Sequence, residues 1–459
     1  MWTPLWRSTL QAGLSATVAC ALGLLMAFAA HHAASRWQPL WWRALLNTVP
    51  IMPTLVVVLM LLAAYGRSGA LAQLGFSGGT WMYGLDGVVI AHAFINAPWV
   101  AQQLQSQFQG ITLERQRLAD QLGLSAWRRF KLVFWPLAAE TLRRQWGLVF
   151  LLCFTSFAVV LVLSGSPRWA TLEVRLYQLI TLEFDIAGAV SLAWLQMLSL
   201  LALMVFLNRQ GAAVVSLGRP QARQVRAWGS VVWLALSALW AIPMLALIVR
   251  ALRLDWWALV SQPVVWQAAW SSLWIAAISA SLALVLSWWL ARGGVTRLGG
   301  LSGVLYFLIP SQVMALALFL AFRELGWGHP AAAVGLSNTL MCLPFMLTVL
   351  IPALARYPQD RLMASLGLSG PVRWRRVHWP RHRALLCWCW VFAFGLSLGD
   401  FGVVALFGSQ DFVTLPYLLY QKLGSYRTGD AYGLALMMWA VLALLFVMAS
   451  PRSPNVTGQ

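Results

Sequence analysis

A single carboxylate lies deep inside a long apolar run of this chain. Asp400 is placed in the stretch AFGLSLGDFGVVALF, which is otherwise uncharged and reads as a membrane segment. An ionisable group inside a membrane is costly to bury, so it is a functional candidate by default. We predict that Asp400 lines a translocation path and favours a cationic solute. A carboxylate hydrogen-bonded to a neighbouring helix is the alternative interpretation.

Three uncharged polar residues share the apolar runs with Asp400. The sequence contains an internal repeat, in which Ser156 of the first copy occupies the position of Asp400 in the second copy. A translocation path lined by both residues would therefore carry charge on one side. His92 and its approximate counterpart Asn338 also lie in apolar runs, where the favoured role of each is a hydrogen bond between helices and the alternative is to line the path. The predicted translocation path therefore comprises Asp400, Ser156, His92 and Asn338.

Other chemistries lack their residues in this sequence. It has no GxxxxGKS/T phosphate-binding loop, no GxSxG or HExxH motif, and no pair of carboxylates within an apolar run. The five cysteines have neither zinc-ligand nor CxxC spacing and are interpreted as small apolar side chains. We expect no catalytic residue, metal site or cofactor in this chain, so any ATP that drives it must bind to a separate protein.

The composition places these residues in a polytopic membrane protein. Of 459 residues, 60% are hydrophobic and 10% are charged, whereas a soluble domain is about 45–50% apolar and about 25% charged. The predicted fold class is therefore all-α. A window of about 20 apolar residues gives about eleven membrane spans, near 8–30, 45–65, 83–105, 145–165, 186–207, 229–251, 264–291, 302–322, 332–354, 385–407 and 431–449.

The positive charge follows the loops between these spans. A net charge of +19 in a soluble protein would indicate nucleic-acid binding. Here most of the 32 Lys and Arg residues lie in alternate loops, which is the positive-inside pattern. We therefore expect a lipid bilayer and no nucleic acid as the partner of this charge. The bias predicts an N-terminus outside, a C-terminus in the cytoplasm, and two strongly basic cytoplasmic loops.

The two basic loops are copies of one element. Residues 117–136 read RLADQLGLSAWRRFKLVFWP, and residues 361–380 read RLMASLGLSGPVRWRRVHWP, without a gap between them in the alignment. An even number of spans separates the copies, so the two halves of the chain run parallel. Two equivalent elements imply a partner with two equivalent sockets.

The repeat also sets the predicted organisation of the chain. We predict a first half at 1–207, a polar cytoplasmic linker at 208–228 and a second half at 229–459. The second half has two spans before Pro310, whereas the first half has one span before the equivalent Pro53. The first half is therefore expected to lack one helix at its start.

Each copy of the repeated element predicts a helix, a tight turn and a second helix. Two Leu residues four apart share a helix face, the following Gly permits a positive φ, Ser caps the next helix, and Trp-Pro starts another. An ordinary interfacial loop is the alternative for one copy taken alone. The matched residues are Leu118, Leu122, Gly123, Leu124, Ser125, Trp135 and Pro136 in the first copy, and Leu362, Leu366, Gly367, Leu368, Ser369, Trp379 and Pro380 in the second.

This element resembles the cytoplasmic EAA loop of ABC importer permeases, with its Gly, variable stretch and closing Pro. In that family the loop is the coupling helix that sits in a groove of the ATPase subunit. Here Arg117-Leu118-Ala119 and Arg361-Leu362-Met363 stand where Glu-Ala-Ala is usual. The acidic residue is lost, while the residues of the turn are kept.

A narrower resemblance covers nearly the whole chain. Tyr65-Gly-Arg67, Ala91-His-Ala-Phe94 and LGDFGVVALFG at 398–408 are similar to the fused thiamine ABC transporter permeases. That family implies two permease halves in one chain, twelve spans, the type I importer fold and the bacterial inner membrane. The chain matches from the family's second span onward.

The same resemblance implies a function and partners. These are import of thiamine and its phosphates by alternating access, two copies of a cytoplasmic ABC ATPase that hold ATP and magnesium, and a periplasmic binding protein. A permease for ferric iron or another small cation is the alternative substrate class. An ion-coupled secondary transporter is the alternative of another kind, but it predicts several intramembrane charges and no paired docking loops.

Overall fold

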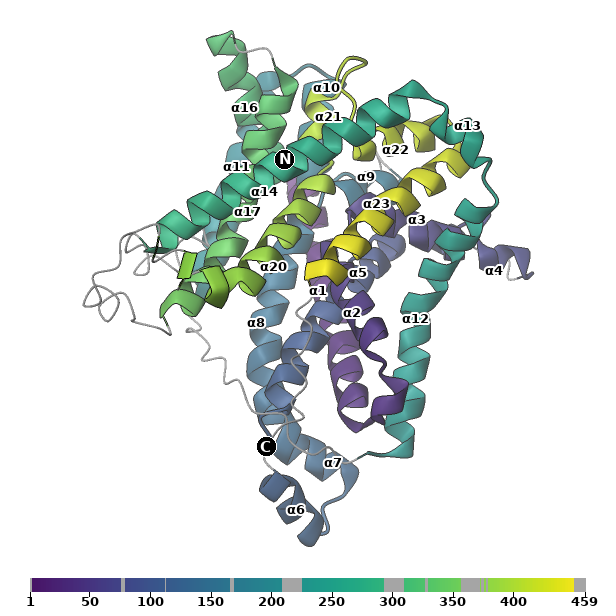
Figure 1. The fold of residues 1–459 in the computed structure, drawn as a ribbon, viewed down its shortest axis with the longest axis vertical. Helices are drawn as coiled ribbons and strands as arrows, with labels where there is room; N and C mark the ends of the chain where they lie inside the picture. Colours follow the sequence, from purple (N-terminus) through teal and green to yellow (C-terminus); the bar gives the residue numbers. More distant parts are fainter. Residues whose placement is uncertain are drawn as a thin grey trace. The chain divides into compact units, whose positions relative to one another are not determined.

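The computed structural model describes residues 2–75, 79–111, 113–165, 169–208, 225–292, 309–326, 329–355, 372, 375–376 and 379–449. Helices form nearly all of this part of the chain, and it contains no strand (Figure 1). The predicted all-α class is therefore confirmed. The helices form two compact units, with residues 1–50 and 57–253 in unit 1 and residues 51–56 and 254–459 in unit 2.

Unit 1 is built around its first helix, which packs against α5, α8 and α12. Its short elements are η1 (Ser35–Trp37), η2 (Val49–Ile51), α4 (Ala70–Gln73), η3 (Gly79–Met82), α7 (Ala126–Arg129), η4 (Phe130–Phe134) and α9 (Ala158–Leu163). Its longer helices are α1 (Trp2–His32), α2 (Leu40–Thr48), α3 (Thr54–Tyr65), α5 (Leu85–Phe108), α6 (Leu113–Gln121), α8 (Trp135–Phe154), α10 (Leu172–Thr181), α11 (Ile186–Asn208) and α12 (Ala227–Leu252).

Unit 2 is built in the same way around α14, which packs against α17, α20 and α22. The first residues of α3 and the segment before them, 51–56, belong to this unit. Its helices are α13 (Trp256–Val260), α14 (Pro263–Arg292), α16 (Ser311–Leu325), α17 (Pro330–Ala355), α20 (Trp379–Leu398), α21 (Val404–Phe407), α22 (Leu415–Gly424) and α23 (Thr428–Ala449).

Seven helices of the described part are long and apolar enough to cross a membrane, which makes the chain a multi-pass membrane protein. They span Trp2–His32, Thr54–Gln73, Ile186–Leu203, Ala227–Leu252, Pro263–Ala291, Pro330–Ile351 and Thr428–Ala449, and His382–Leu398 is a shorter apolar helix. Three predicted spans, 45–65, 145–165 and 385–407, are not continuous helices. The first is divided among α2, η2 and α3 around Pro53. The other two begin earlier than predicted, at their Trp-Pro pairs, and break before their predicted ends.

The internal repeat is visible in how α1 and α14 pack. Ala12, Ser15, Ala16 and Ala19 of α1 are fully buried. So are the residues 264 positions later, Ala276, Ser279, Ala280 and Ala283. Small residues of this kind let helix backbones approach closely inside a membrane. Each helix also caps a later one, because the hydroxyls of Ser8 and Ser272 accept hydrogen bonds from the backbone N–H groups of Leu172 (2.9 Å) and Leu415 (2.7 Å).

The predicted division at 208–228 concerns the sequence repeat and stays a prediction, since most of that linker lies outside the described residues. The packing units divide at a different place. Helix α12, which the repeat assigns to the second half, packs in unit 1. There the indole N–H of Trp240 donates to the carbonyl of Phe94 at 2.9 Å, and their rings stack 5.6 Å apart.

Candidate functional site

The broken helix of unit 2 carries the buried carboxylate. Helix α20 ends at Leu398 and α21 begins at Val404, with Asp400 in the break between them. The backbone N–H of Gly402 donates to Asp400 Oδ1 at 3.1 Å. Asp400 Oδ2 is buried and has no hydrogen-bond partner among the residues that the structure describes. The break therefore satisfies one carboxylate oxygen and leaves the other available.

Two polar residues from neighbouring helices lie at the same break. Gln312 of α16, fully buried, donates from Nε2 to the carbonyl of Gly402 at 2.7 Å. Asn338 of α17 donates from Nδ2 to Ser397 Oγ at 2.8 Å, and the N–H of Asp400 donates to the carbonyl of the same serine at 3.3 Å. The structure thus brings Asn338 and Asp400 together through Ser397. Unwound backbone of this kind inside a membrane protein is found where it lines a cavity or an ion or substrate site.

Backbone packing holds the break in place. A Cβ added to Gly399 would lie 2.8 Å from the Cα of Pro53, so only glycine fits against the segment 51–56 that belongs to this unit. The backbone at Gly399, directly before Asp400, is therefore held against Pro53. Sequence reasoning paired Pro53 with Pro310 but did not place it beside Asp400.

The broken helix of unit 1 has a hydroxyl in place of the carboxylate. Helix α8 ends at Phe154 and α9 begins at Ala158, with Ser156 between them. His92 of α5 pairs with α1, where its Nδ1 lies 3.2 Å from the hydroxyl of Ser15. This is the interhelical hydrogen bond that the sequence favours for His92.

The first copy of the repeated element has the local structure that its sequence predicts. Helix α6 ends at Gln121, and Gly123 adopts a left-handed conformation with φ +61°. The N–H of Leu124 donates to the carbonyl of Ala119 at 3.1 Å, which closes the helix end. Ser125 Oγ accepts from the N–H of Arg128 at 3.4 Å, and Pro136 lies in the first turn of α8.

The outer face of this element is apolar and exposed. Leu118 is 55% exposed, Leu122 65%, Trp127 70% and Leu132 63%. On its inner face Arg129 forms an ion pair with Asp120. Exposed apolar side chains on an otherwise polar segment indicate an interaction surface.

Aromatic rings join this element to the membrane helices, a feature that sequence reasoning missed. Phe134 is buried and packs edge-on against Phe28 and Phe108, with ring centroids 5.1 and 5.2 Å apart, and against His31 at 5.3 Å. These partners come from α1 and α5. The signal available in the sequence is the pair Phe130 and Phe134, which lie one helical turn apart just before Trp-Pro.

The second copy lies largely outside the described residues. Leu362, Leu366, Gly367, Leu368 and Ser369 fall within 356–371, which the structure does not describe. Trp379 and Pro380 are described, and they form the first turn of α20, as the sequence predicts.

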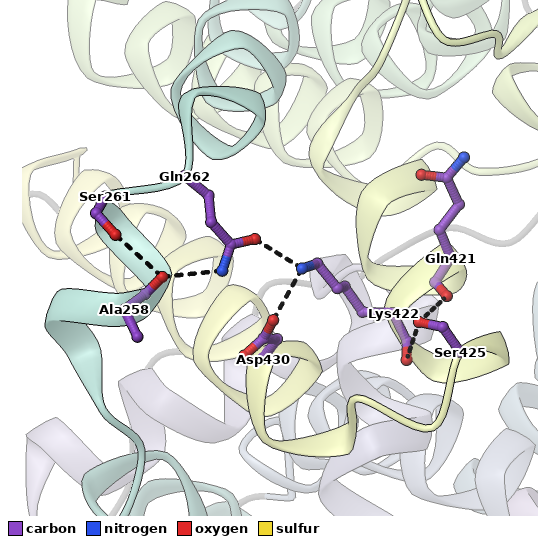
Figure 2. A network of polar contacts seen from close by, with 7 residues as sticks. All are labelled: Ala258, Ser261, Gln262, Gln421, Lys422, Ser425 and Asp430. Carbon is purple, nitrogen blue, oxygen red and sulfur yellow. Dashed lines mark hydrogen bonds and ion pairs between the residues drawn. The ribbon is translucent and has the colours of Figure 1, made fainter.

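A buried polar network at the opposite end of unit 2 was also missed by sequence reasoning. Lys422 of α22 is only 7% exposed. Figure 2 shows its ammonium donating to Asp430 Oδ2 of α23 at 2.8 Å and to Gln262 Oε1 at 2.7 Å. Gln262 in turn donates to the carbonyl of Ala258 at 2.9 Å. The network ties α22 to α23 and to the start of α14.

In unit 1 a buried acidic side chain links the corresponding helices, where unit 2 uses the buried Lys422. Glu173 of α10 is fully buried, and its Oε1 accepts from Gln196 Nε2 of α11 at 2.5 Å. In both units a polar contact therefore holds the second short helix after the break, α10 or α22, to the long helix that follows it, α11 or α23. No group of three His, Cys, Asp or Glu side chains that could hold a metal ion occurs in the described part of the chain.

Broken membrane helices with polar residues at the break, repeated in two similarly built units, define a membrane transport permease. No family model matches the sequence. The chain is 37% identical to the thiamine transport system permease protein ThiP of Escherichia coli, over 87% of this chain and 79% of that protein. It is 34% identical to ThiP of Salmonella typhimurium, over 97% of this chain and 90% of that protein.

A more distant relative reflects the two-half organisation. The molybdenum transport system permease protein ModB of Mycobacterium bovis is 30% identical over 48% of this chain and 94% of its own length. One nearly complete shorter permease thus corresponds to about half of this chain. The chain belongs to the ThiP family of ABC importer permeases, and it is a multi-pass protein of the bacterial inner membrane.

Proposed function

We propose that the chain is the membrane subunit that carries thiamine and thiamine phosphates from periplasm to cytoplasm. The observation that carries this proposal is the similarity at 34–37% identity to several permeases whose names specify thiamine. The free oxygen of Asp400 supports it, because the thiazolium ring of thiamine is a cation that a buried carboxylate attracts. Asp400, Asn338 and Ser156 then line the translocation path.

The partners follow from the permease class. A cytoplasmic ATPase subunit docks on each copy of the repeated element, and the two subunits bind ATP and magnesium. The exposed Leu118 and Leu122 supply the apolar contact of the first copy. A periplasmic binding protein delivers the substrate at the opposite face.

Alternating access is driven through the aromatic cluster in which Phe134 packs against Phe28 and Phe108. Closure of the ATPase dimer displaces the first docking element, and Phe134 passes that displacement to α1 and α5 because a packed aromatic cluster moves as a unit. Helices α8 and α20 begin at the docking elements and end at the breaks. Each of these helices therefore connects an ATPase subunit directly to the translocation path.

Asp400 favours any small cation, so a ferric-iron permease is the second candidate function. The test is uptake in a bacterium deleted for its own thiamine permease, with the chain expressed beside its genomic neighbours that encode the ATPase and the binding protein. Radiolabelled thiamine should accumulate in an ATP-dependent manner, and excess thiamine monophosphate should compete with it. Accumulation of iron with no accumulation of thiamine would reject the proposed substrate.

A further inference from the structure

A cavity of about 360 Å³ lies in unit 2 where α16 ends and α17 begins. Its walls are mainly aromatic, and Phe319 and Phe407 meet edge to face with ring centroids 6.2 Å apart. The lining residues include Phe319, Phe322, Arg323, His329, Pro330 and Phe407. Ligand pockets span about 300–1,000 Å³ and combine apolar walls with a few polar groups, so this cavity has the size and lining of a small-molecule site.

The corresponding place in unit 1 is covered by the chain itself. When Thr54 is aligned with Ser311, Tyr65 corresponds to Phe322 at the end of the helix. Tyr65 packs against Trp81, with ring centroids 5.9 Å apart, and Trp81 belongs to η3.

The guanidinium of Arg67 lies 5.1 Å from the ring centroid of Tyr83, also in this connection. In unit 1 the indole of Trp81 therefore lies against the aromatic ring at the end of α3, and the Arg67 guanidinium lies over a second ring in the connection.

The connection that follows the first of these helices is shorter in unit 2 than in unit 1. Residues 66–84 connect α3 to α5 and include α4 and η3, whereas α16 is connected to α17 by residues 326–329 alone. Gly326, with φ +65°, ends α16 and allows the chain to turn at once. In unit 2 the described aromatic residues at the end of α16, Phe319 and Phe322, line the cavity.

The charges of the lining select the occupant. Arg323 is the charged member of the described lining, which includes no carboxylate. An aromatic cation would meet the Arg323 guanidinium unfavourably, whereas a phosphate would accept hydrogen bonds from it. We propose that this cavity binds a phosphate ester with a ring or apolar body, whose phosphate lies against Arg323 and His329 and whose body lies between the phenylalanines.

Two sources supply that chemistry at the outer face, where Arg323 is expected from the charge pattern. One is a phosphorylated form of thiamine, and this source depends on the proposed function. The other is an anionic phospholipid headgroup with the first part of its acyl chains. In either case the cavity recognises the anionic part of a ligand rather than a cation.

The test uses the full chain purified into nanodiscs of phosphatidylcholine alone. Binding of thiamine monophosphate, thiamine and inorganic phosphate is measured by calorimetry for wild type, Arg323→Gln, Arg323→Lys and Phe407→Ala. Loss of a charge-assisted hydrogen bond should weaken thiamine monophosphate binding roughly tenfold or more in Arg323→Gln. Arg323→Lys should largely retain binding, and Phe407→Ala should weaken it.

Arg67→Gln is the matched control, because it removes the arginine of the corresponding unit 1 connection and should leave binding unchanged. A parallel arm replaces a fifth of the lipid by phosphatidylglycerol and counts retained lipid by native mass spectrometry. Retention that falls in Arg323→Gln, with no binding of thiamine monophosphate, assigns the site to lipid. The proposal is overturned if Arg323→Gln changes neither ligand.

Binding and uptake separate the two proposals. Uptake of thiamine with no Arg323-dependent binding would overturn the cavity site and leave the proposed transport function standing. Arg323-dependent binding without any uptake would overturn the transport function and leave the site standing.

Discussion

An equivalent helix is interrupted at an equivalent place in both units, but the polar side chain at the interruption differs. In unit 1 the break between α8 and α9 contains Ser156, and in unit 2 the break between α20 and α21 contains Asp400. Asp400 adds a charge with one free buried oxygen. Because the two halves are different stretches of one chain, the residue at each break can differ, and the break in unit 2 carries a carboxylate where the break in unit 1 carries a hydroxyl.

The same comparison holds at the ends of the helices. In unit 1 Trp81 of η3 packs against Tyr65 at the end of α3, and in unit 2 the end of α16 lines a cavity. Unit 1 uses a buried glutamate to tie α10 to α11, and unit 2 uses a buried lysine to tie α22 to α23. Shared elements thus maintain the frame of both units, and the differences lie in the polar groups at the breaks and in the contacts between helices.

The largest effect is expected at the docking element that both halves share. A valine at Gly123 would be forced into a left-handed conformation, which costs about 1–2 kcal/mol, so the turn should open. Gly123→Val combined with Gly367→Val should abolish co-purification of the ATPase and transport with it.

Gly75→Val is the matched control, since Gly75 also has a positive φ, +88°, and open space around it. It should retain the ATPase. Retention of the ATPase by the double variant would mean that the repeated element is not the docking site.

Asp400→Asn should produce the next largest effect, because it keeps the size of the side chain and removes its charge. Loss of a charged contact worth about 1.5–3 kcal/mol corresponds to a loss of roughly tenfold or more in uptake at low thiamine concentration. The measurement is initial uptake rate against concentration, with surface expression checked for each variant.

Ser156→Asp sharpens the comparison between the breaks, and it should restore part of the uptake when combined with Asp400→Asn. If the Asp400→Asn variant takes up thiamine as fast as the wild type, Asp400 does not line the translocation path.

The tie in unit 2 should matter more for stability than the surface ion pair in unit 1. Lys422→Met would leave the half-buried Asp430 without its cation, at a cost of about 1–3 kcal/mol in the free energy of unfolding. Arg175 and Glu183 form an ion pair with both side chains partly exposed, so Arg175→Met should cost about 0.5 kcal/mol.

Thermal unfolding of both variants in detergent measures the difference. Equal shifts in melting temperature would show that burial does not strengthen the Lys422 contacts.

The smallest effect tests what the units have in common. Ser8→Ala and Ser272→Ala each remove one buried cap, and each should cost about 1 kcal/mol. Similar losses of thermal stability in the two variants would match their equivalent geometry. A loss in one variant only would indicate that one of the two caps does not contribute to the folded state.

The sequence by itself determined the membrane class, the all-α fold and the conformation of the first copy of the repeated element. Apolar length predicts a span because the bilayer has a fixed thickness. Gly123 and Pro136 act through the backbone within a few residues of themselves, so their spacing was sufficient to predict the turn and the start of α8. The break at Asp400 was not predicted, since the apolar run continues through it.

Only the tertiary structure decided which polar groups meet. Lys422 is separated from Gln262 by 160 residues, and Ser8 is separated from Leu172 by 164. His92 faces Ser15, and Asn338 meets Asp400 through Ser397, because helix packing selects these partners from many polar residues with similar local sequences. Hydrogen bonds between distant helices depend on the rotation and depth of each helix, and neither quantity is encoded within a window of one turn.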